Sequence, residues 1–287
     1  MQGGRRSRPT RSEAKPSEAP EPERERLASA KARLSWGGSH LQAATSIEKA
    51  VDLLLYLHAA PAPIGITQLG RAIGLPKSSV HRLLASLARR GLVQQDEHGG
   101  YEPGVGLVAL GLGAQERDPL VVAARAVLEA EAAATGETVF LVAARSDRLV
   151  VLDKAEGTGF LRASPQVGSA VPVHATAVGK LFLAFGAAPV VHSPLERFTD
   201  RTPANLAELE RAVSRARREG VATSHEEWIS GLSVLAAPIS VRGRLRGALA
   251  LGAPTPRLDP ARGPALLARV RAAAERIAER LAGTRHD

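Results

Sequence analysis

The sequence predicts an α+β protein with an N-terminal winged helix-turn-helix, a connecting helix and a larger C-terminal α+β domain. Three observations lead to this prediction. Apolar residues recur at helical spacing in three short segments between residues 46 and 91, a hairpin pattern follows, and short β-rich runs begin only after residue 137. At 287 residues the chain is long enough for two domains that each bury a core.

The first two predicted helices are short and amphipathic. Ser46 is the expected N-cap of the first helix, which ends at a proline-rich breaker, residues 61 to 63. Its recurring apolar positions are Ala50, Val51, Leu54, Leu55 and His58. Thr67 is the expected cap of a second helix that carries Leu69, Ala72 and Ile73.

The third predicted helix follows a Gly74-Leu75-Pro76 turn and stops at Gly91. Its expected buried positions are Val80, Leu83, Leu84 and Leu87. This arrangement turns the leading polar residues of the helix outward, with His81 at the edge of the buried face. Residues 92–95 and 101–102 then flank a polar Asp-Glu-His-Gly-Gly tip, which predicts the hairpin of a winged helix.

The remaining elements form a connector and a mixed domain. Residues 105–135 read as helix, divided by an Asp118-Pro119 start signal. Strands are expected at 138–144, 148–154, 160–163, 170–172, 232–239 and 247–251, and helices at 175–185, 206–219 and 264–282. Thr176 is the expected N-cap of the helix near residue 175, and Gly179 is expected to permit close packing there.

Charge in the first third of the chain favours a polyanion partner, most simply DNA. From Leu53 to Gln95 there are five Lys or Arg residues and no Asp or Glu. In a helix-turn-helix the second helix of the motif enters the major groove by its N-terminal end. The predicted DNA-binding residues are Thr67, Gln68, Lys77, Ser78, Ser79, His81 and Arg82.

Other readings of this region stay open. Lys77 and Arg82 would also suit an ordinary solvated helix face, and His81 is as well suited to packing as to contact. The helices would then serve protein contacts in a sensor or an enzyme. RNA is disfavoured because the basic region has almost no aromatic residues on which single strands stack.

Composition excludes several classes of protein. With no cysteine, the chain has no disulfides, thiolate metal sites or cysteine nucleophiles, and we expect no metal and no cofactor. No apolar run reaches transmembrane length and no secretion signal is evident, so we expect a cytoplasmic protein without membrane contact. Residues 1–42 are expected to be a disordered, solubilising extension or a basic arm that adds phosphate contacts.

Enzyme signatures are weak. Residues 104–109 formally match a GxGxxA dinucleotide loop, but no buried strand precedes them. His225 lacks the second histidine of an HExxH zinc motif, and no GxSxG elbow surrounds Ser233. The sequence therefore predicts no catalytic residues.

Three motifs resemble the IclR family of bacterial transcription regulators. They are residues 66–84 around the predicted turn, residues 173–180 (Val-His-Ala-Thr-Ala-Val-Gly-Lys), and residues 218–239 with the paired Glu226 and Glu227. They occur in the family's order over roughly residues 45 to 283, although Ser79 stands where Thr is commoner. The resemblance implies a GAF-like effector domain, a homodimer or tetramer, promoter DNA as partner, and a small-molecule effector, often an organic or aromatic acid.

The resemblance also implies positions for the effector, which are Ala177, Val178, Ser224, Val234, Ala250 and Gly252. The residues themselves add His174 and Trp228 to the expected effector site. His174 suits either a carboxylate anchor or a hydrogen-bonded core group, Trp228 either a pocket wall or a core plug. Ser224, Ala250 and Gly252 predict a less polar pocket than is usual in relatives, or a different ligand.

The expected division into domains follows from these elements. It is 1–42 extension, 43–104 winged helix-turn-helix, 105–119 linker helix and 120–283 effector domain. The expected function is a ligand-responsive regulator, more often a repressor in such families, of a catabolic or secondary-metabolic operon.

Overall fold

The computed structural model describes residues 45–159, 165–186, 191, 193–258 and 261–283. The chain forms two compact units that divide between Leu107 and Val108, and each is described here by itself. Among the described residues, no helix has the length and apolarity needed to cross a membrane. The expected extension 1–42 and the expected strand 160–163 lie largely or wholly outside the described residues.

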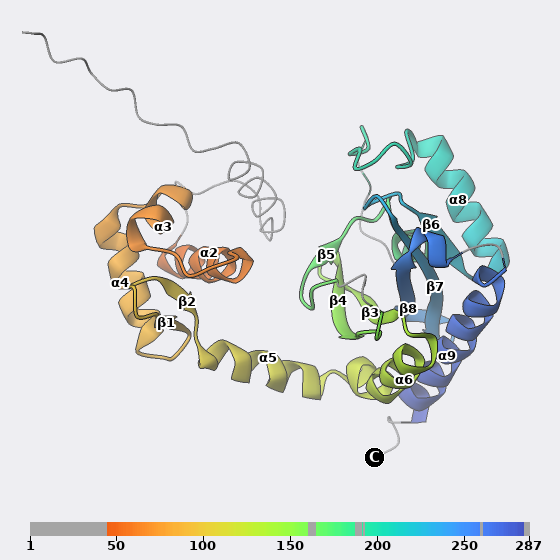
Figure 1. Ribbon diagram of the computed structural model, residues 1–287, viewed down its shortest axis with the longest axis horizontal. Coiled ribbons are helices and arrows are strands. Elements are labelled where there is room, and N and C mark those ends of the chain that lie inside the picture. Colours follow the sequence, from red (N-terminus) through yellow and green to blue (C-terminus); the bar gives the residue numbers. More distant parts are fainter. Residues whose placement is uncertain (1–44, 160–164, 187–190, 192, 259–260, 284–287) are drawn as a thin grey trace, which may run out of the picture. The chain divides into compact units, whose positions relative to one another are not determined.

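The first unit is a winged helix-turn-helix, as predicted (Figure 1). Its elements are α2 (Ser46–Ala59), α3 (Ile66–Ala72), α4 (Lys77–Ala88), β1 (Val93–Gln95) and β2 (Tyr101–Pro103). One apolar cluster holds the three helices and the hairpin together, with Leu53, Leu69, Val80 and Leu84 fully buried at its centre. Burial of these side chains is the main term that stabilises so small a unit.

The two predicted helix caps of this unit are wrong by one or two residues. Thr45, not Ser46, caps α2: its hydroxyl accepts from the Glu48 N–H at 3.3 Å, and Glu48 accepts from the Thr45 N–H at 2.6 Å. This capping box satisfies two backbone donors reciprocally. Helix α3 begins after Gly65 without a side-chain cap, so Thr67 lies within its first turn.

The predicted buried face of α2 is also wrong in phase. The structure buries Leu53, Tyr56 and Leu57, while Val51 and His58 are exposed. Five consecutive apolar residues in this helix, 53–57, make both faces apolar, so the 3.6-residue spacing alone cannot select the face that packs.

Two helices follow the wing and meet at Asp118, as predicted. Helix α5 (Val105–Arg117) contains no buried residue, and α6 (Pro119–Thr135) begins where the Asp118 carboxylate accepts from the Leu120 N–H at 2.9 Å. At the start of α5 the Gly106 N–H donates to the Gly91 carbonyl, and a Cβ on Gly104 would lie 2.3 Å from that same oxygen. These glycines allow close packing against Gly91 rather than forming a nucleotide loop.

The second unit is built on a six-stranded sheet with the order β5-β4-β3-β8-β7-β6, in which every neighbouring pair is antiparallel. The strands are β3 (Thr138–Arg145), β4 (Arg148–Ala155), β5 (Ala170–Val171), β6 (Ala222–His225), β7 (Leu232–Val241) and β8 (Arg244–Pro254). All but β6 were predicted, with bounds that differ by up to three residues. A short 3₁₀ turn, η1 (Thr255–Arg257), follows β8.

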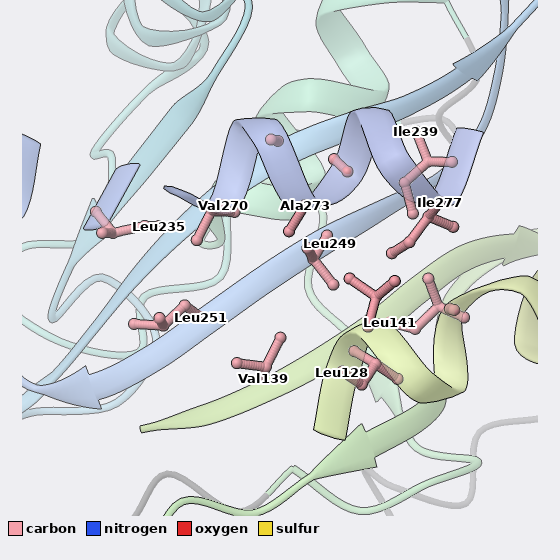
Figure 2. Close-up of a cluster of buried hydrophobic side chains, with 14 of the residues drawn as sticks. Leu128, Val139, Leu141, Leu235, Ile239, Leu249, Leu251, Val270, Ala273 and Ile277 are labelled. Carbon is pink, nitrogen blue, oxygen red and sulfur yellow. The ribbon is translucent and has the colours of Figure 1, made fainter. Parts of the chain in front are cut away.

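Helices cover both faces of this sheet. Helices α6 and α9 (Gly263–Gly283) pack on one face, where Leu128, Leu141, Leu249 and Ile277 interlock (Figure 2). Helices α7 (Ala177–Ala184) and α8 (Leu206–Glu219) pack on the other face. The α+β fold class predicted from the sequence is confirmed.

Candidate functional site

The turn between α3 and α4 is compact enough to set the two helices as a helix-turn-helix pair. Gly74 has a φ of 67°, which favours glycine, and the Leu75 N–H donates to the Gly70 carbonyl at 2.9 Å. A Cβ on Gly70 would lie 2.9 Å from the Leu75 carbonyl oxygen, so a larger residue there would push the turn away. The sequence motif therefore has a direct steric basis.

The leading end of α4 presents polar and cationic side chains to solvent. Lys77, Ser78, His81 and Arg82 are exposed and Ser79 is half-buried, because Val80 and Leu84 turn into the core. Within the described residues, neither Lys77 nor Arg82 has an ion pair or a side-chain hydrogen bond. This face therefore keeps its full positive charge for a partner.

Thr67 and Gln68 are exposed in the first turn of α3. The wing, formed by β1 and β2, follows α4 in the chain. The wing hairpin is tied to the helices because Ile64 and Tyr101 exchange two backbone hydrogen bonds of 2.9 Å. Its tip is organised by Asp96, whose carboxylate accepts from the N–H groups of His98 and Gly100. The wing tip thus carries acidic side chains, unlike α4.

Half of the expected effector residues share one face of the sheet in the second unit. Strand register places Ser224 (β6), Val234 (β7) and Gly252 (β8) side by side, and Thr138 (β3) is next in the same row. Since side chains two residues apart share a face, Ala250 lies on this face too. Ser224, Ala250 and Gly252 are buried and Val234 is half-buried.

Helix α7 packs on this face of the sheet, against β6, β7 and β8. The Thr176 hydroxyl caps the helix by accepting from the Gly179 N–H at 3.0 Å, as predicted, and it donates to the Pro172 carbonyl. Ala177 and Val178 are buried at the first two helical positions, and their N–H groups meet no acceptor among the described residues. Free N–H groups at a helix N-terminus favour an anion.

His174 is engaged at the junction before α7. Its Nε2 donates to the Glu196 carbonyl oxygen at 2.8 Å, and its ring stacks on Phe198 with centroids 5.5 Å apart. Thr199 and Thr202 of the same segment donate to the carbonyl oxygens of Glu226 and Glu227. The segment therefore links His174 to the loop that precedes β7.

Trp228 is half-buried in that loop and packs against the apolar cluster beneath α7. The carboxylate of Glu226 has a lowered pKa, chiefly because of a backbone hydrogen bond with Gly231. Glu226 is also one of three non-glycine residues with a positive φ (55°) in the described chain. The paired glutamates thus shape the loop, and the structure gives each of them a partner.

A buried ion pair between α7 and the loop that precedes β7 was not predicted. The Lys180 ammonium donates to Glu227 Oε1 at 2.5 Å and to the Thr223 carbonyl at 3.1 Å, and its side chain is 5% exposed. Burial lowers the pKa of Lys180, and the Glu227 carboxylate opposes that shift. The signal in the sequence was a single lysine within the apolar run of α7, Ala-Val-Gly-Lys-Leu-Phe-Leu-Ala.

Lys180 and Glu227 border a surface cavity of about 320 Å³ between α8 and β6, whose lining includes Arg211, Arg215 and His225. A wider hollow of about 570 Å³ lies on the outer side of α8 and shares Arg211 and Arg215 with it. Neither cavity is lined by the expected effector residues. Within the described residues, no cluster of His, Asp and Glu is arranged to hold a metal ion.

Comparison with known proteins assigns both units to domains of one family. The family model for the IclR helix-turn-helix domain matches residues 46–97, and the model for the bacterial transcriptional regulator IclR C-terminal domain matches residues 113–279. The chain belongs to the IclR family of bacterial transcriptional regulators. It is 31% identical over 223 residues to the HTH-type transcriptional regulator XynR of Escherichia coli, covering 75% of this chain and 88% of XynR.

Other IclR-family proteins extend the comparison along the chain. The glycerol operon regulatory protein of Streptomyces coelicolor is 29% identical over 249 residues, which cover 84% of this chain and 97% of that protein. The crystal structure of an IclR regulator from Silicibacter sp. TM1040 superposes with a TM-score of 0.67 at 27% identity, over 83% of this chain and 96% of that one. The chain is therefore a helix-turn-helix transcriptional regulator and not an enzyme.

Proposed function

We propose that this IclR-family regulator is a repressor that releases its operator when its second unit binds a small organic acid. The regulated operon belongs to catabolism or secondary metabolism, and the regulator acts as a homodimer or tetramer. The observation that carries the DNA-binding part is the exposed, acid-free leading face of α4.

In the proposed complex α4 enters the major groove by its N-terminal end. Lys77 and Arg82 contact phosphate or guanine, and Ser78 and Ser79 donate to phosphate or base edges. Thr67 and Gln68, at the start of α3, contact the sugar-phosphate backbone of the DNA. His81 lies at the margin of the interface. The acidic tip of the wing, Asp96 and Glu97, repels phosphate, so we assign the main contacts to the helices.

The acid-sensing part rests on the face beneath α7. The carboxylate of the effector accepts from the free N–H groups of Ala177 and Val178, and the helix dipole favours its negative charge. Ser224 adds a hydroxyl, while Val234, Ala250 and Gly252 contact an apolar body. His174 and Trp228 position the surrounding loops. We also propose that the chain consists of an extension (1–42), a DNA-binding domain (43–104), a linker helix (105–119) and an effector domain (120–283).

Names of relatives support repression and an acid effector. Two relatives are called the acetate operon repressor (28% identical, Salmonella typhimurium) and the DNA-binding transcriptional repressor YiaJ (29% identical, Escherichia coli). A structural neighbour from Microbacterium hydrocarbonoxydans, with a TM-score of 0.74 at 23% identity, was crystallised with 4-hydroxybenzoate. At that identity the likeness concerns the fold, so the ligand class remains part of our proposal.

Fluorescence anisotropy with the DNA upstream of this protein's own gene tests the DNA contact. We expect sub-micromolar affinity that falls steeply with salt, because Lys and Arg contacts to phosphate release counterions. Arg82→Ala should weaken binding about 10-fold or more and reduce the salt slope by about one. The control is Arg246→Ala, which removes the same charge from an exposed position of β8.

Binding that is absent, or equally tight in Arg82→Ala and Arg246→Ala, would discard the DNA-reading role of α4. It would favour the alternative in which the N-terminal helices serve protein contacts.

A second experiment tests the effector class and the sign of regulation. Thermal shift with a panel of organic acids, including benzoate and 4-hydroxybenzoate, should raise the melting temperature for at least one acid, because a ligand of the folded state stabilises it. Transcription from the same promoter should fall when the protein is added and recover with that acid. An increase in transcription on adding the protein alone would overturn repression.

A further inference from the structure

A cavity of about 320 Å³ lies between α8 and β6, and polar side chains form most of its lining. Its volume falls at the lower end of the range for small-molecule sites, about 300–1,000 Å³. The lining includes Lys180 from α7, Arg211 and Arg215 from α8, and Thr223 and His225 from β6. None of these residues belongs to the expected effector set, so the cavity is a separate place for a ligand.

Two arginines on this cavity carry charges that the described chain leaves unpaired. Arg211 and Arg215 are one turn apart on α8, so they share a face of the helix, and both are exposed. Neither forms an ion pair or a side-chain hydrogen bond with another described residue, although Glu219 follows Arg215 by one further turn. A guanidinium presents a planar fork of N–H donors that fits the oxygens of a phosphate or a carboxylate. Two such forks therefore border the cavity without an acceptor from the described chain.

Lys180 borders the cavity from α7 with a donor to spare. Its ammonium has three N–H donors, of which Glu227 Oε1 and the Thr223 carbonyl accept two. Burial is the main reason that the pKa of Lys180 is lowered, and the nearby charge of Arg215 lowers it further. The two cations therefore repel one another, and an anion placed between them in the cavity would attract both.

The edge of the sheet adds a backbone donor on the same side. Strand β6 is an edge strand that pairs only with β7. The Thr223 carbonyl bonds to Lys180 and so points away from β7, and the N–H of the same residue points the same way in an antiparallel strand. No described residue accepts from this N–H. Free N–H groups at the edge of a sheet favour an anion.

Carboxylates also line the cavity, and most of them are already engaged. Glu208 accepts from the Ala204 N–H at 2.8 Å, and Glu227 accepts from Lys180. The second carboxylate oxygen of Glu227 is buried, so it does not face the cavity. Glu219, the last residue of α8, is the lining residue whose carboxylate has no hydrogen bond or ion pair with a described residue. Its carboxylate is therefore the group that opposes an anion here, and removing it gives a directional test.

We propose that this cavity is a second ligand site, which binds the phosphate group of a small phosphorylated molecule. Arg211 and Arg215 contact the phosphate oxygens from α8, while Lys180 and the Thr223 N–H donate from α7 and β6. A phosphate monoester fits because it carries nearly two negative charges at neutral pH and has three terminal oxygens that accept hydrogen bonds. The bound phosphate connects α7, α8 and β6. The site does not involve the effector face, so this proposal and acid sensing can each fail alone.

Isothermal titration calorimetry on the full-length protein tests the proposal with inorganic phosphate and ribose 5-phosphate at constant ionic strength. Wild type should bind both, and ribose, which lacks the phosphate, should not bind. Malonate should bind several-fold more weakly than phosphate, because its two carboxylates cannot present their oxygens around one centre. Arg211→Gln and Arg215→Gln should each weaken phosphate binding about 10-fold or more, the effect of losing one charge-assisted hydrogen bond.

Variants at the outer hollow of α8 are the matched controls. Arg218 and Glu210 line that hollow but not the cavity. Arg218→Gln and Glu210→Gln should each change phosphate affinity less than about 2-fold at physiological salt, where exposed charges are screened. Glu219→Gln should instead tighten binding, because it removes the carboxylate that opposes the anion. All five substituted side chains are exposed on α8, so circular dichroism should show the wild-type fold for each variant.

Thermal unfolding gives a second readout. Phosphate salts stabilise proteins generally because they are excluded from the protein surface, so the useful quantity is the difference between variants at equal phosphate. Phosphate at about 10 times its dissociation constant should raise the melting temperature of wild type by about 2–4 °C more than that of Arg215→Gln, since a ligand of the folded state stabilises it.

Three outcomes would overturn the proposal. The site is discarded if wild type shows no binding by either method, or if Arg215→Gln binds phosphate as tightly as Arg218→Gln. Malonate bound as tightly as phosphate would overturn the assignment to a phosphate group. Weaker phosphate binding by Glu219→Gln would contradict the position of the anion beside α8.

Discussion

The ammonium group of Lys180 is buried beside the carboxylate of Glu227, whose side chain is only 14% exposed. Removing two charges from water is expensive, and their attraction offsets that penalty only while both are present. Here Glu227 Oε2 is buried without a partner, so the balance depends on the single contact through Oε1. We therefore expect the ion pair to add little net stability and to act mainly by fixing how α7 packs against the loop that precedes β7.

Lys180→Met should destabilise the second unit by about 3 kcal/mol, because it leaves the Glu227 charge buried and unpaired. The double variant Lys180→Met, Glu227→Gln should recover much of that loss, since no charge remains to be solvated. Chemical denaturation followed by circular dichroism measures both. Equal stabilities of the single and double variants would contradict the assignment of a buried, coupled pair.

The same residue predicts a pH dependence. The folded state lowers the pKa of Lys180 from its model-compound value of 10.5, so between the folded and unfolded pKa values the unfolded chain binds more protons. Stability must then rise with pH across that window. The advantage of wild type over Lys180→Met should therefore grow as the pH rises from the lowered pKa of Lys180 in the folded protein towards its ordinary value of 10.5.

Single residues show where sequence reasoning succeeded and where it failed. Thr176 was predicted as a cap because a hydroxyl preceded an apolar helix, and that local signal was sufficient. Ser46 was predicted as the cap of α2, but the structure has Thr45, whose Thr-x-x-Glu spacing to Glu48 forms a capping box. The Thr138 hydroxyl is buried without a hydrogen-bond partner. No sequence pattern predicts this, because it depends on strand register and on which atoms lie nearby.

At the scale of elements, the position of α7 depends on one glycine. A Cβ on Gly179 would lie 1.8 Å from the Val173 carbonyl oxygen, a distance that no packing adjustment of side chains can relieve. This confirms the expectation that Gly179 permits close packing. Because the first turn of α7 also forms part of the proposed effector site, a displaced helix would affect both stability and sensing.

Gly179→Ala should destabilise the second unit by roughly 1–3 kcal/mol, the usual effect of forcing atoms into a packed core. Gly111→Ala is its control: Gly111 is in α5, where a Cβ would meet nothing within 4 Å. That change should instead stabilise α5 by about 0.5–1 kcal/mol, since alanine is the better helix former. Thermal denaturation of both variants tests the pair, and a stabilising Gly179→Ala would refute the close contact.

Elements with one apolar face and clear end signals were predictable from sequence, and the others were not. The division at Asp118 and the bounds of α8 were found because a cap, a proline or a glycine marked each end. Strand β6 was missed because Ala-Thr-Ser-His lacks β-branched apolar alternation and is held as a short edge strand by β7. Helix α2 had its buried face misassigned because both of its faces are apolar.

At the scale of the whole molecule, each of the two units has its own hydrophobic core. Leu84 belongs to the apolar cluster of the first unit, and Leu141 belongs to a cluster of the second unit. The connecting helix α5 buries none of its residues. The two-part organisation was predictable from the change of periodicity near residue 137, whereas the effector face was approximated only through the family resemblance, since it joins strands far apart in sequence.

Separate cores predict two unfolding transitions in scanning calorimetry. Leu84→Ala and Leu141→Ala each remove a fully buried leucine and should each destabilise one unit by about 2–5 kcal/mol, so each should lower the temperature of one transition and leave the other in place. Operator DNA should raise only the transition that Leu84→Ala lowers, because a ligand stabilises the unit whose folded state it binds. A single transition that moves with either substitution would show that the units unfold together, and the DNA would then stabilise the whole chain.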